Sequence, residues 1–320
     1  MKFSSLNKNF LKAGIIDWLL DADISLHFQT RKYLLEQDAE GLVSLQNRIQ
    51  LEGWGKKILT KRRSDGHWGR GYYQPKWTST HYTLLDLRNL EFPKENPLVK
   101  ESVDLVLRAP VGTRGGINLA KTIHESDVCI NGMILNYSSY FLPDDVRLKL
   151  IVDYLLEVKM GDGGWNCAYL KGASHSSLHT TLSVLEGLNE FKSCRVNYRL
   201  NEIILAEKLG IEFLLVHHLY KSHRTGKIID PKMLRLSYPS RWRYDILRAL
   251  DYFQKAKIKF DHRMSDALNV IKKKQYINGT WLLQAPHEGE VHFEMEKVGK
   301  PSRWNTLRAL RVLQFYEQFV

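Results

Sequence analysis

Apolar residues recur at three- and four-residue spacing in six segments of the chain, and this spacing is typical of helices with one buried face. Most of these segments open with Ser, Thr or Asp, which are favourable residues at a helix N-terminus. Further segments of this kind lie between them, at 145–159 and 202–220. The six principal segments are 23–35, 79–90, 126–141, 176–188, 240–253 and 302–316. The pattern therefore predicts pairs of helices that repeat along the chain.

Glycine-rich turns separate the helix pairs at a nearly regular interval. Three of the turns contain a Trp: "SDGHWGRG" at Ser64, "GDGGWNC" at Gly161 and "INGTW" at Ile277. Two related turns without a Trp, "GTRGGI" and "HRTGKI", lie between them, and one Gly from each turn gives steps of 48 to 63 residues. Repeats of about this length are typical of architectures in which each helix pair buries its apolar face against its neighbours.

Six helix pairs with alternating inner and outer helices favour a closed ring. We therefore expect an all-α fold, an α/α toroid (barrel) of about six helix hairpins. We expect one domain over 1–320, in which 1–60 contain the first helix pair and an N-terminal extension and 61–320 the remaining repeats. Closure would bring the N-terminal ends of the inner helices around one mouth, where free N–H groups and helix dipoles favour an anion. The residues at the equivalent position of the six segments are His27, His81, Cys129, His179, Arg243 and Trp304.

The overall charge and the cysteine content narrow the class of protein. The 320 residues carry a net charge of +12, which favours anionic partners, but the basic residues are scattered, so we expect no nucleic-acid partner. The three cysteines, Cys129, Cys167 and Cys194, argue against a disulfide framework and suit a reducing compartment. The N-terminus lacks a signal-peptide pattern, and no apolar run reaches the ~18 residues of a spanning helix. We therefore expect a cytoplasmic protein without a transmembrane segment.

The Gly-Trp turns and the six helix pairs resemble the terpenoid cyclase and protein prenyltransferase superfamily of α/α toroids. "DGGWNC" followed by "SSLHTTLSVLEGL" is similar to the repeat of squalene cyclases. The Asp-rich acid motif of those enzymes is missing, which counts against a cyclase of that class. The whole chain also resembles a bacterial family of squalene-cyclase-like or prenyltransferase-like toroid proteins.

A second motif resembles the zinc site of protein prenyltransferase β subunits. In "HESDVCING" and "HTTLSVLEGL", the residues Asp127, Cys129 and His179 match the family's Asp-x-Cys and His ligands. The resemblance implies zinc as cofactor, and it implies that Lys121 and His124 contact a diphosphate. Lys121 stands where the family has an arginine, and no counterpart of the family's α subunit is visible, so the need for a second subunit is left open.

Each candidate residue also has an ordinary structural interpretation. Asp127 can be a helix cap, Cys129 a small core residue and His179 a hydrogen-bonded helix starter. Cys167 is an additional candidate ligand or a buried thiol. The turn residues Trp68, Trp165 and Trp281 are expected to lock one repeat to the next.

Residues near the starts of the last two inner helices are candidates for substrate binding. Asp245 is either an acid or the partner of an arginine. The substrate-binding candidates that join His81, Lys121 and His124 are Arg241, Trp242, Arg243, Arg303 and Trp304. Aromatic faces there would suit cationic character in an isoprenoid, and the guanidinium groups would suit phosphate oxygens.

These observations favour a zinc-dependent, prenyltransferase-like enzyme that acts on an isoprenoid or a similar small hydrophobic substrate, with a prenyl diphosphate as one such substrate. Asp127, Cys129 and His179 would hold the metal, which would activate a nucleophile or act as a Lewis acid. Two alternatives stay open. One is a metal-independent cyclase or lyase whose acid is Asp127 or Asp245, and the other is a non-catalytic toroid that binds a ligand or a protein.

Overall fold

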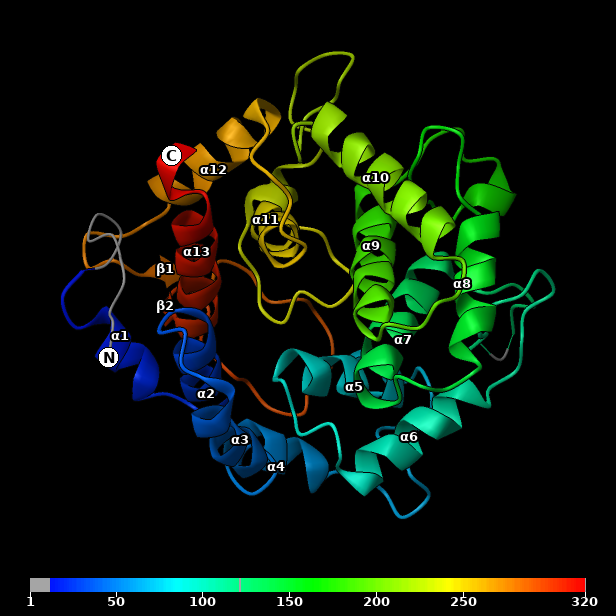
Figure 1. The fold of residues 1–320 in the computed structure, drawn as a ribbon, viewed down its shortest axis with the longest axis horizontal. Coiled ribbons are helices and arrows are strands. Elements are labelled where there is room, and N and C mark those ends of the chain that lie inside the picture. The colour runs from blue at the N-terminus through cyan, green and yellow to red at the C-terminus, as the bar shows by residue number, and fades with distance from the viewer. Residues whose placement is uncertain (1–11, 121, 320) are drawn as a thin grey trace.

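Six helices form the inner wall of a closed ring (Figure 1). The computed structural model describes residues 12–120 and 122–319. The inner helices are α2 (Ile24–Tyr33), α5 (Thr80–Asn89), α7 (Val128–Phe141), α9 (Leu178–Ser193), α11 (Ile246–Lys255) and α13 (Arg303–Phe315). Each contacts the next, and the last of them, α13, contacts the first, α2. The predicted α/α toroid is confirmed.

The outer layer covers the apolar backs of the inner helices. Its helices are α1 (Ile15–Leu20), α3 (Ala39–Arg48), α4 (Gly53–Leu59), α6 (Pro97–Leu107), α8 (Leu148–Glu157), α10 (Leu200–Val216) and α12 (Ser265–Lys273). Short 3-10 helices occupy Lys76–Thr78, Tyr169–Lys171, Pro231–Leu234, His262–Met264 and Glu317–Phe319. The strands β1 (Trp281–Leu282) and β2 (Pro301–Ser302) pair antiparallel just before α13. No helix in the described part of the chain is long and apolar enough to cross a membrane.

The turn tryptophans form the same joint in three repeats. The side chains of Trp68, Trp165 and Trp281 are completely buried. Each indole N–H donates to a carbonyl ten residues earlier, at the end of the preceding outer helix; these acceptors are Ile58, Leu155 and Ile271, at 2.7–2.8 Å. Each Trp backbone N–H donates to a threonine in the first turns of the next inner helix; these acceptors are Thr80, Thr181 and Thr306, at 3.0–3.1 Å. As expected, these residues lock an outer helix to the following inner helix.

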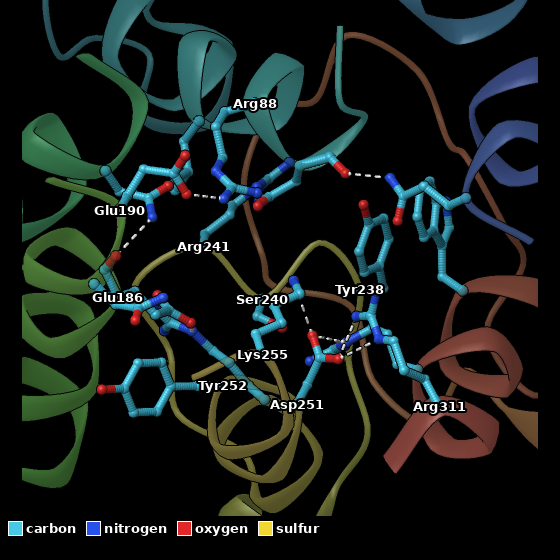
Figure 2. Close-up of a pocket in the computed structure, with 18 residues that line it drawn as sticks. Arg88, Glu186, Glu190, Tyr238, Ser240, Arg241, Asp251, Tyr252, Lys255 and Arg311 are labelled. Carbon is cyan, nitrogen blue, oxygen red and sulfur yellow. Dashed lines mark hydrogen bonds and ion pairs between the residues drawn. The ribbon is translucent and has the colours of Figure 1, made fainter. Parts of the chain in front are cut away.

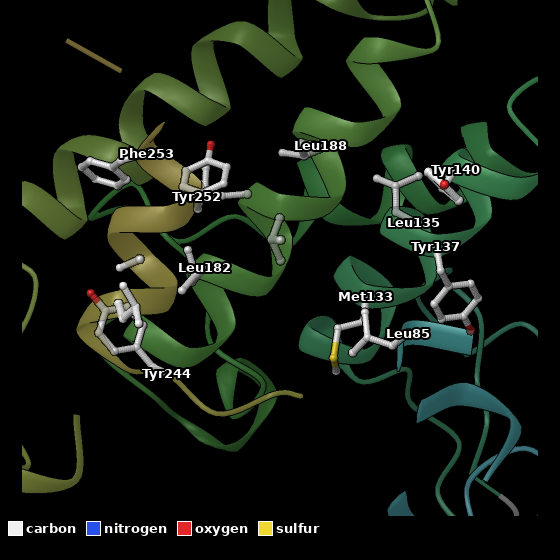
Figure 3. Packing of buried hydrophobic residues seen from close by; sticks show 14 of the residues in the cluster. Leu85, Met133, Leu135, Tyr137, Tyr140, Leu182, Leu188, Tyr244, Tyr252 and Phe253 are labelled. Atoms are coloured by element: carbon white, nitrogen blue, oxygen red, sulfur yellow. The ribbon is translucent and has the colours of Figure 1, made fainter. Parts of the chain in front are cut away.

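The helices α7 and α9 approach each other through glycines. A Cβ atom at Gly132 would lie 2.6 Å from the backbone oxygen of Ser183, and a Cβ at Gly187 would meet the backbone oxygen of Gly132. Glycine is therefore needed at this crossing for steric reasons, although it lowers helix propensity by about 1 kcal/mol relative to alanine. Figure 3 shows leucine and tyrosine side chains of α7, α9 and α11 buried around this contact.

One inner helix begins later than its sequence pattern suggests. The segment 240–253 predicted a helix from its first Ser, but α11 begins at Ile246. Asp245 is the N-cap residue, and its carboxylate accepts the N–H of Arg248 at 2.9 Å. Before it, Arg241 has a φ of 55°, which a helix does not allow. Residues 238–243 therefore form a loop that enters the ring.

Candidate functional site in the centre of the ring

A cavity of about 80 Å³ lies in the middle of the ring (Figure 2). A single buried water needs roughly 10–15 Å³ on this measure, so the space suits several waters or a small polar group. The inner helices supply most of the lining, and Tyr238, Ser240 and Arg241 of the loop before α11 supply the rest. The charged lining residues are Arg88, Glu186, Glu190, Arg241, Arg248, Asp251, Lys255, Arg308 and Arg311. Six of these are basic and three acidic, so the cavity has an excess of positive charge.

The two glutamates of the cavity pair with arginines of neighbouring inner helices. Glu186 of α9 accepts from Arg248 of α11, with Nη2 to Oε2 at 2.6 Å and Nε to Oε1 at 3.0 Å. Glu190 of α9 pairs with Arg88 of α5. Each of these arginines therefore forms an ion pair that joins α9 to another inner helix.

Asp251 is the shared partner of three cationic side chains. Its carboxylate oxygens lie 3.0 Å from Nε of Arg311, 3.2 Å from Nζ of Lys255 and 3.6 Å from Nε of Arg308. Burial raises the pKa of Asp251, but Arg311, Lys255 and Arg308 outweigh this effect and hold the pKa well below its usual range. One carboxylate cannot neutralise three cations, so this corner of the cavity carries most of the positive excess.

Several guanidinium nitrogens in the cavity have no hydrogen-bond partner within the described residues. They include Nη1 of Arg308 and Nη1 of Arg311, on side chains that are about nine-tenths buried or more. A buried donor left unpaired costs about 1–3 kcal/mol, so such groups are uncommon in proteins unless they bind something. The two donors lie on adjacent turns of α13, beside the shared carboxylate. This geometry suits an oxyanion.

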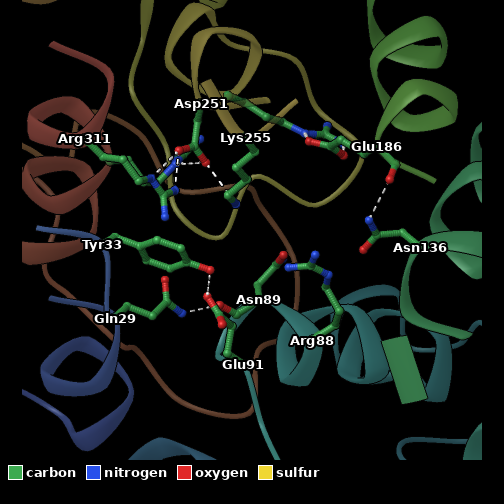
Figure 4. A network of polar contacts seen from close by, with 12 residues as sticks. Gln29, Tyr33, Arg88, Asn89, Glu91, Asn136, Glu186, Asp251, Lys255 and Arg311 are labelled. Atoms are coloured by element: carbon green, nitrogen blue, oxygen red, sulfur yellow. Dashed lines mark hydrogen bonds and ion pairs between the residues drawn. The ribbon is translucent and has the colours of Figure 1, made fainter. Parts of the chain in front are cut away.

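Lys255 is the last residue of α11, and its side chain lines the cavity while remaining 38% exposed. Figure 4 shows Lys255 and Arg311 reaching toward the centre from one side, and Arg88 and Glu91 from the other. Burial lowers the pKa of Lys255 to about 8, with Arg311 and Arg88 acting in the same direction. Asp251 and Glu91 act in the opposite direction and do not restore the ordinary value.

A second pocket, of about 250 Å³, adjoins the cavity and shares Tyr238 and Arg241 with it. It lies beneath the segment 286–298, whose residues supply much of its lining. The segment is attached to the ring by Trp77, whose indole donates to the Glu288 carbonyl at 2.6 Å. Trp77, Phe293 and Met295 give this pocket a more apolar lining than the central cavity has.

Asp86 of α5 faces the second pocket and is almost completely buried. Burial raises its pKa to about 6, and Arg241, whose Nη2 lies 4.0 Å away, opposes this shift only in part. Oδ1 of Asp86 has no hydrogen-bond partner among the described residues. Burial also raises the pKa of Asp127 and of Asp245, so Asp86 joins these two aspartates as a candidate proton donor.

The three predicted zinc ligands lie at the N-terminal ends of α7 and α9. Asp127 occupies the N-cap position of α7 without a capping bond, and the backbone N–H of Cys129 donates to Sγ of Cys167 at 3.2 Å. Nδ1 of His179 accepts the N–H of Tyr244 at 2.8 Å. Within residues 12–120 and 122–319, no three His, Cys, Asp or Glu side chains are grouped closely enough to hold a metal ion. Zinc and its three ligands therefore stay a prediction.

Two of the predicted substrate-binding residues reach the cavity. Trp304 stacks on Tyr238 with ring centroids 4.4 Å apart, and both line it. Arg241 also lines it, with its guanidinium 4.5 Å from the centre of the Trp77 ring. Of these two residues, Arg241 also lines the second pocket, whereas Trp304 lines the central cavity alone.

The other predicted residues lie elsewhere. Trp242 lies 5.4 Å from the His179 ring, and Arg243 lies over Trp242 at 5.1 Å. Arg303 donates from Nε to the carbonyl of Trp18 in α1, at 3.1 Å. None of these three lines either pocket described above.

The four remaining predicted residues have separate outcomes. His81 is buried with Nδ1 3.3 Å from the hydroxyl of Tyr137, and burial lowers its pKa to about 3. His124 is exposed. Lys121 lies outside the described residues. Asp245, named as a candidate acid, is the α11 cap, and burial raises its pKa.

Sequence analysis missed the charged residues in the middle and at the ends of the inner helices. Asp251 and Lys255 are four residues apart, as are Glu186 and Glu190, while Arg308 and Arg311 are three apart. Charged residues at helical spacing on segments that are otherwise apolar were the available signal. The expected mouth was defined by the first turns, whereas the cavity extends along the later turns.

No protein-family model and no curated protein matches this chain. Among solved structures, it is similar to a glycosyl hydrolase family 88 protein from Bacteroides vulgatus, with 10% identity, a TM-score of 0.51, and coverage of 93% of this chain and 91% of that one. It is also similar to a polysaccharide lyase, with 10% identity, a TM-score of 0.51, and coverage of 96% and 98%. At such low identity these likenesses establish the fold alone.

A type II terpene cyclase from Scytonema is a further structural neighbour, with 14% identity. Its TM-score is 0.35, and the likeness covers 87% of this chain and 97% of that one.

Proposed function

We propose that this protein is an enzyme that binds a small anionic substrate in the central cavity. The observation that carries the proposal is a pair of buried Nη1 donors, on Arg308 and Arg311, in a cavity with excess positive charge; in the described part of the chain neither donor has a hydrogen-bond partner. Guanidinium groups bind the oxygens of carboxylate and phosphate groups through charge-assisted hydrogen bonds, so two of them on successive turns of one helix suit such an anion. The rest of a larger substrate would lie outside the ring.

Acid–base chemistry is the reaction type that the surrounding groups favour. Lys255 is an amine whose pKa of about 8 lets it exist partly in the neutral form near physiological pH. The arginines would neutralise charge that develops on the anionic group when a neighbouring proton is removed. The names of the hydrolase and lyase neighbours point to carbohydrates as the substrates of those two proteins. A sugar that carries a carboxylate would also suit the cationic cavity of this chain, so it is the first probe.

The isoprenoid diphosphate predicted from the sequence is the second candidate, and one observation favours it. The apolar pocket beneath 286–298 adjoins the charged cavity and shares Tyr238 and Arg241 with it. A diphosphate head could bind the arginines while an apolar chain enters the second pocket. Asp86 would then be a further candidate, beside Asp127 and Asp245, for the acid of a metal-independent reaction.

Binding of defined anions tests both candidates. We expect pyrophosphate to bind in calorimetry, and Arg308→Gln to raise its Kd at least tenfold, because a hydrogen bond to a charged group contributes about 1.5–3 kcal/mol. Arg108→Gln is the matched control, since the Arg108 side chain is 69% exposed and belongs to the residue that follows α6, outside the cavity. Its Kd is expected to equal that of the wild type.

The choice of ligand separates the two candidates. Tighter binding of glucuronate than of geranylgeranyl diphosphate would support a polar anionic substrate, and the reverse order would support the isoprenoid. If no anion binds, or if Arg308→Gln binds pyrophosphate as tightly as the wild type does, the central cavity is not the anion site.

Zinc is tested separately, by elemental analysis of protein purified without chelators. The sequence predicts about one zinc per chain, and Cys129→Ser should then lose most of it while Cys194→Ser retains it. Protein that contains no zinc and takes up none on addition would remove the metal-dependent mechanism and leave the anion-binding proposal intact.

A further inference from the structure

The side chain of Lys255 lines the central cavity and is also accessible to solvent. Its amine reaches the central cavity, yet 38% of the side chain is exposed, so a small molecule can approach it from solvent. Its carboxylate partner, Asp251, at 3.2 Å, is shared with Arg308 and Arg311. The amine therefore lies within a cationic cluster that one carboxylate only partly neutralises.

Charged groups on other inner helices complete its surroundings. From the side of α5, Arg88 and Glu91 face it, and Arg88 is itself paired with Glu190 of α9. Glu91 is engaged by Lys32 and by the hydroxyl of Tyr33, both at 2.5 Å. Glu91 and Glu190 are thus already paired with other groups, and neither forms its ion pair with Lys255.

We propose that Lys255 is a nucleophilic amine that forms an imine with small carbonyl compounds that carry an anionic group. The inference rests on the proposed function, because Arg308 and Arg311 must first hold the anion beside the amine. Neighbouring cations are one of the two means by which proteins make a lysine nucleophilic, and partial burial is the other. Both act here and outweigh Asp251 and the C-terminal end of α11, which favour the charged form.

Formation of the imine from the neutral amine and the carbonyl compound releases one water molecule and needs no oxidant or reductant. The lone pair of Nζ attacks the carbonyl carbon, and the C=O electron pair moves to oxygen. The two amine protons leave with that oxygen as water, and a C=N bond remains. Cyanoborohydride, added as a reagent, delivers hydride to the imine carbon and converts the product to a stable secondary amine.

Glyoxylate is the appropriate probe, because it combines an aldehyde with a carboxylate in a small molecule. At pH 7.5 about a quarter of an amine with a pKa near 8 is neutral, against about one in a thousand for an ordinary lysine. We expect Lys255 in the wild-type protein to be labelled by glyoxylate and cyanoborohydride at least tenfold faster than other lysines, as read by peptide mass spectrometry. Pyrophosphate should protect it, and glycolaldehyde, which lacks the carboxylate, should label it at least tenfold more slowly.

Two variants make the result specific. Lys255→Met should lose the fast label, whereas Lys257→Met, which removes an exposed lysine two residues away, should keep it. Labelling spread evenly over the lysines, or equal labelling by glycolaldehyde, would overturn the inference. If pyrophosphate binds in calorimetry but Lys255 is not labelled, the inference on Lys255 fails and the anion site stands; if neither occurs, both fail.

Discussion

Replacing Asp251 by Asn is expected to lower the free energy of unfolding by about 3–5 kcal/mol, the range found when one member of a buried ion pair is removed. The reason is that Asp251 is the shared partner of Arg308, Arg311 and Lys255, two of which are almost completely buried. Urea unfolding at pH 7, followed by circular dichroism, measures the change. Because the folded-state pKa of Asp251 is depressed, its contribution is fully present above the unfolded pKa of about 3.9 and is lost as the pH falls below it. The difference between wild type and variant should therefore shrink in acid.

Two controls show whether the loss of stability in Asp251→Asn comes from the buried cations that are left without their carboxylate. Asp266→Asn removes a carboxylate that pairs with Lys221 at the surface, with 47% of its side chain exposed, and should cost no more than about 1 kcal/mol. Adding Arg311→Met to Asp251→Asn should restore part of the lost stability, because one of the stranded cations is then removed. A loss below 1 kcal/mol for Asp251→Asn would mean that the cluster is better solvated than its burial indicates.

Replacing Trp165 by Ala should lower the free energy of unfolding by about 3–5 kcal/mol, the range for large-to-small changes of a buried aromatic residue. The indole is completely buried and also donates to the Leu155 carbonyl at 2.7 Å, so the substitution creates a cavity and leaves an acceptor without its donor. Trp165→Phe retains much of the volume and should cost less. Thermal and urea unfolding measure both.

Trp242→Ala is the matched control, because this residue lies in the loop before α11 and is only partly buried. Trp242→Ala should lower the free energy of unfolding by much less than Trp165→Ala does. Equal losses at the two positions would show that the turn tryptophans are not the joints between repeats, and the interpretation of the Gly-Trp turns would have to change.

The architecture could be predicted because it is repeated. The helices that contain His81, Cys129 and His179 occupy nearly the predicted residues, since apolar spacing and capping residues act locally. The segment at 240–253 shows the limit of that method. Its early residues, among them Arg241, have apolar neighbours at helical spacing, yet they form a loop within the ring, where Arg241 lies over the ring of Trp77. Tertiary contacts decided the conformation there.

The candidate site was harder to predict for a related reason. Asp251, Lys255 and Arg311 meet because α11 and α13 are neighbours in the ring, and no local pattern reveals which polar residues of two helices will share one carboxylate. The family resemblance directed attention to the first turns, where Asp127 and His179 lie. The structure directs it to the later turns, where buried charges gather.

The contact between α13 and α2 has a consequence for how the protein loses its structure. In a linear array of helix pairs, the two end units each lack a neighbour and are the first to open. Here the guanidinium of Arg311 lies 4.6 Å from the centre of the Tyr33 ring, and Trp304 stacks against Trp54 with ring centroids 6.1 Å apart, so the last repeat is joined to the first. Every inner helix consequently has two partners, and the circle offers no terminal unit from which unravelling could begin.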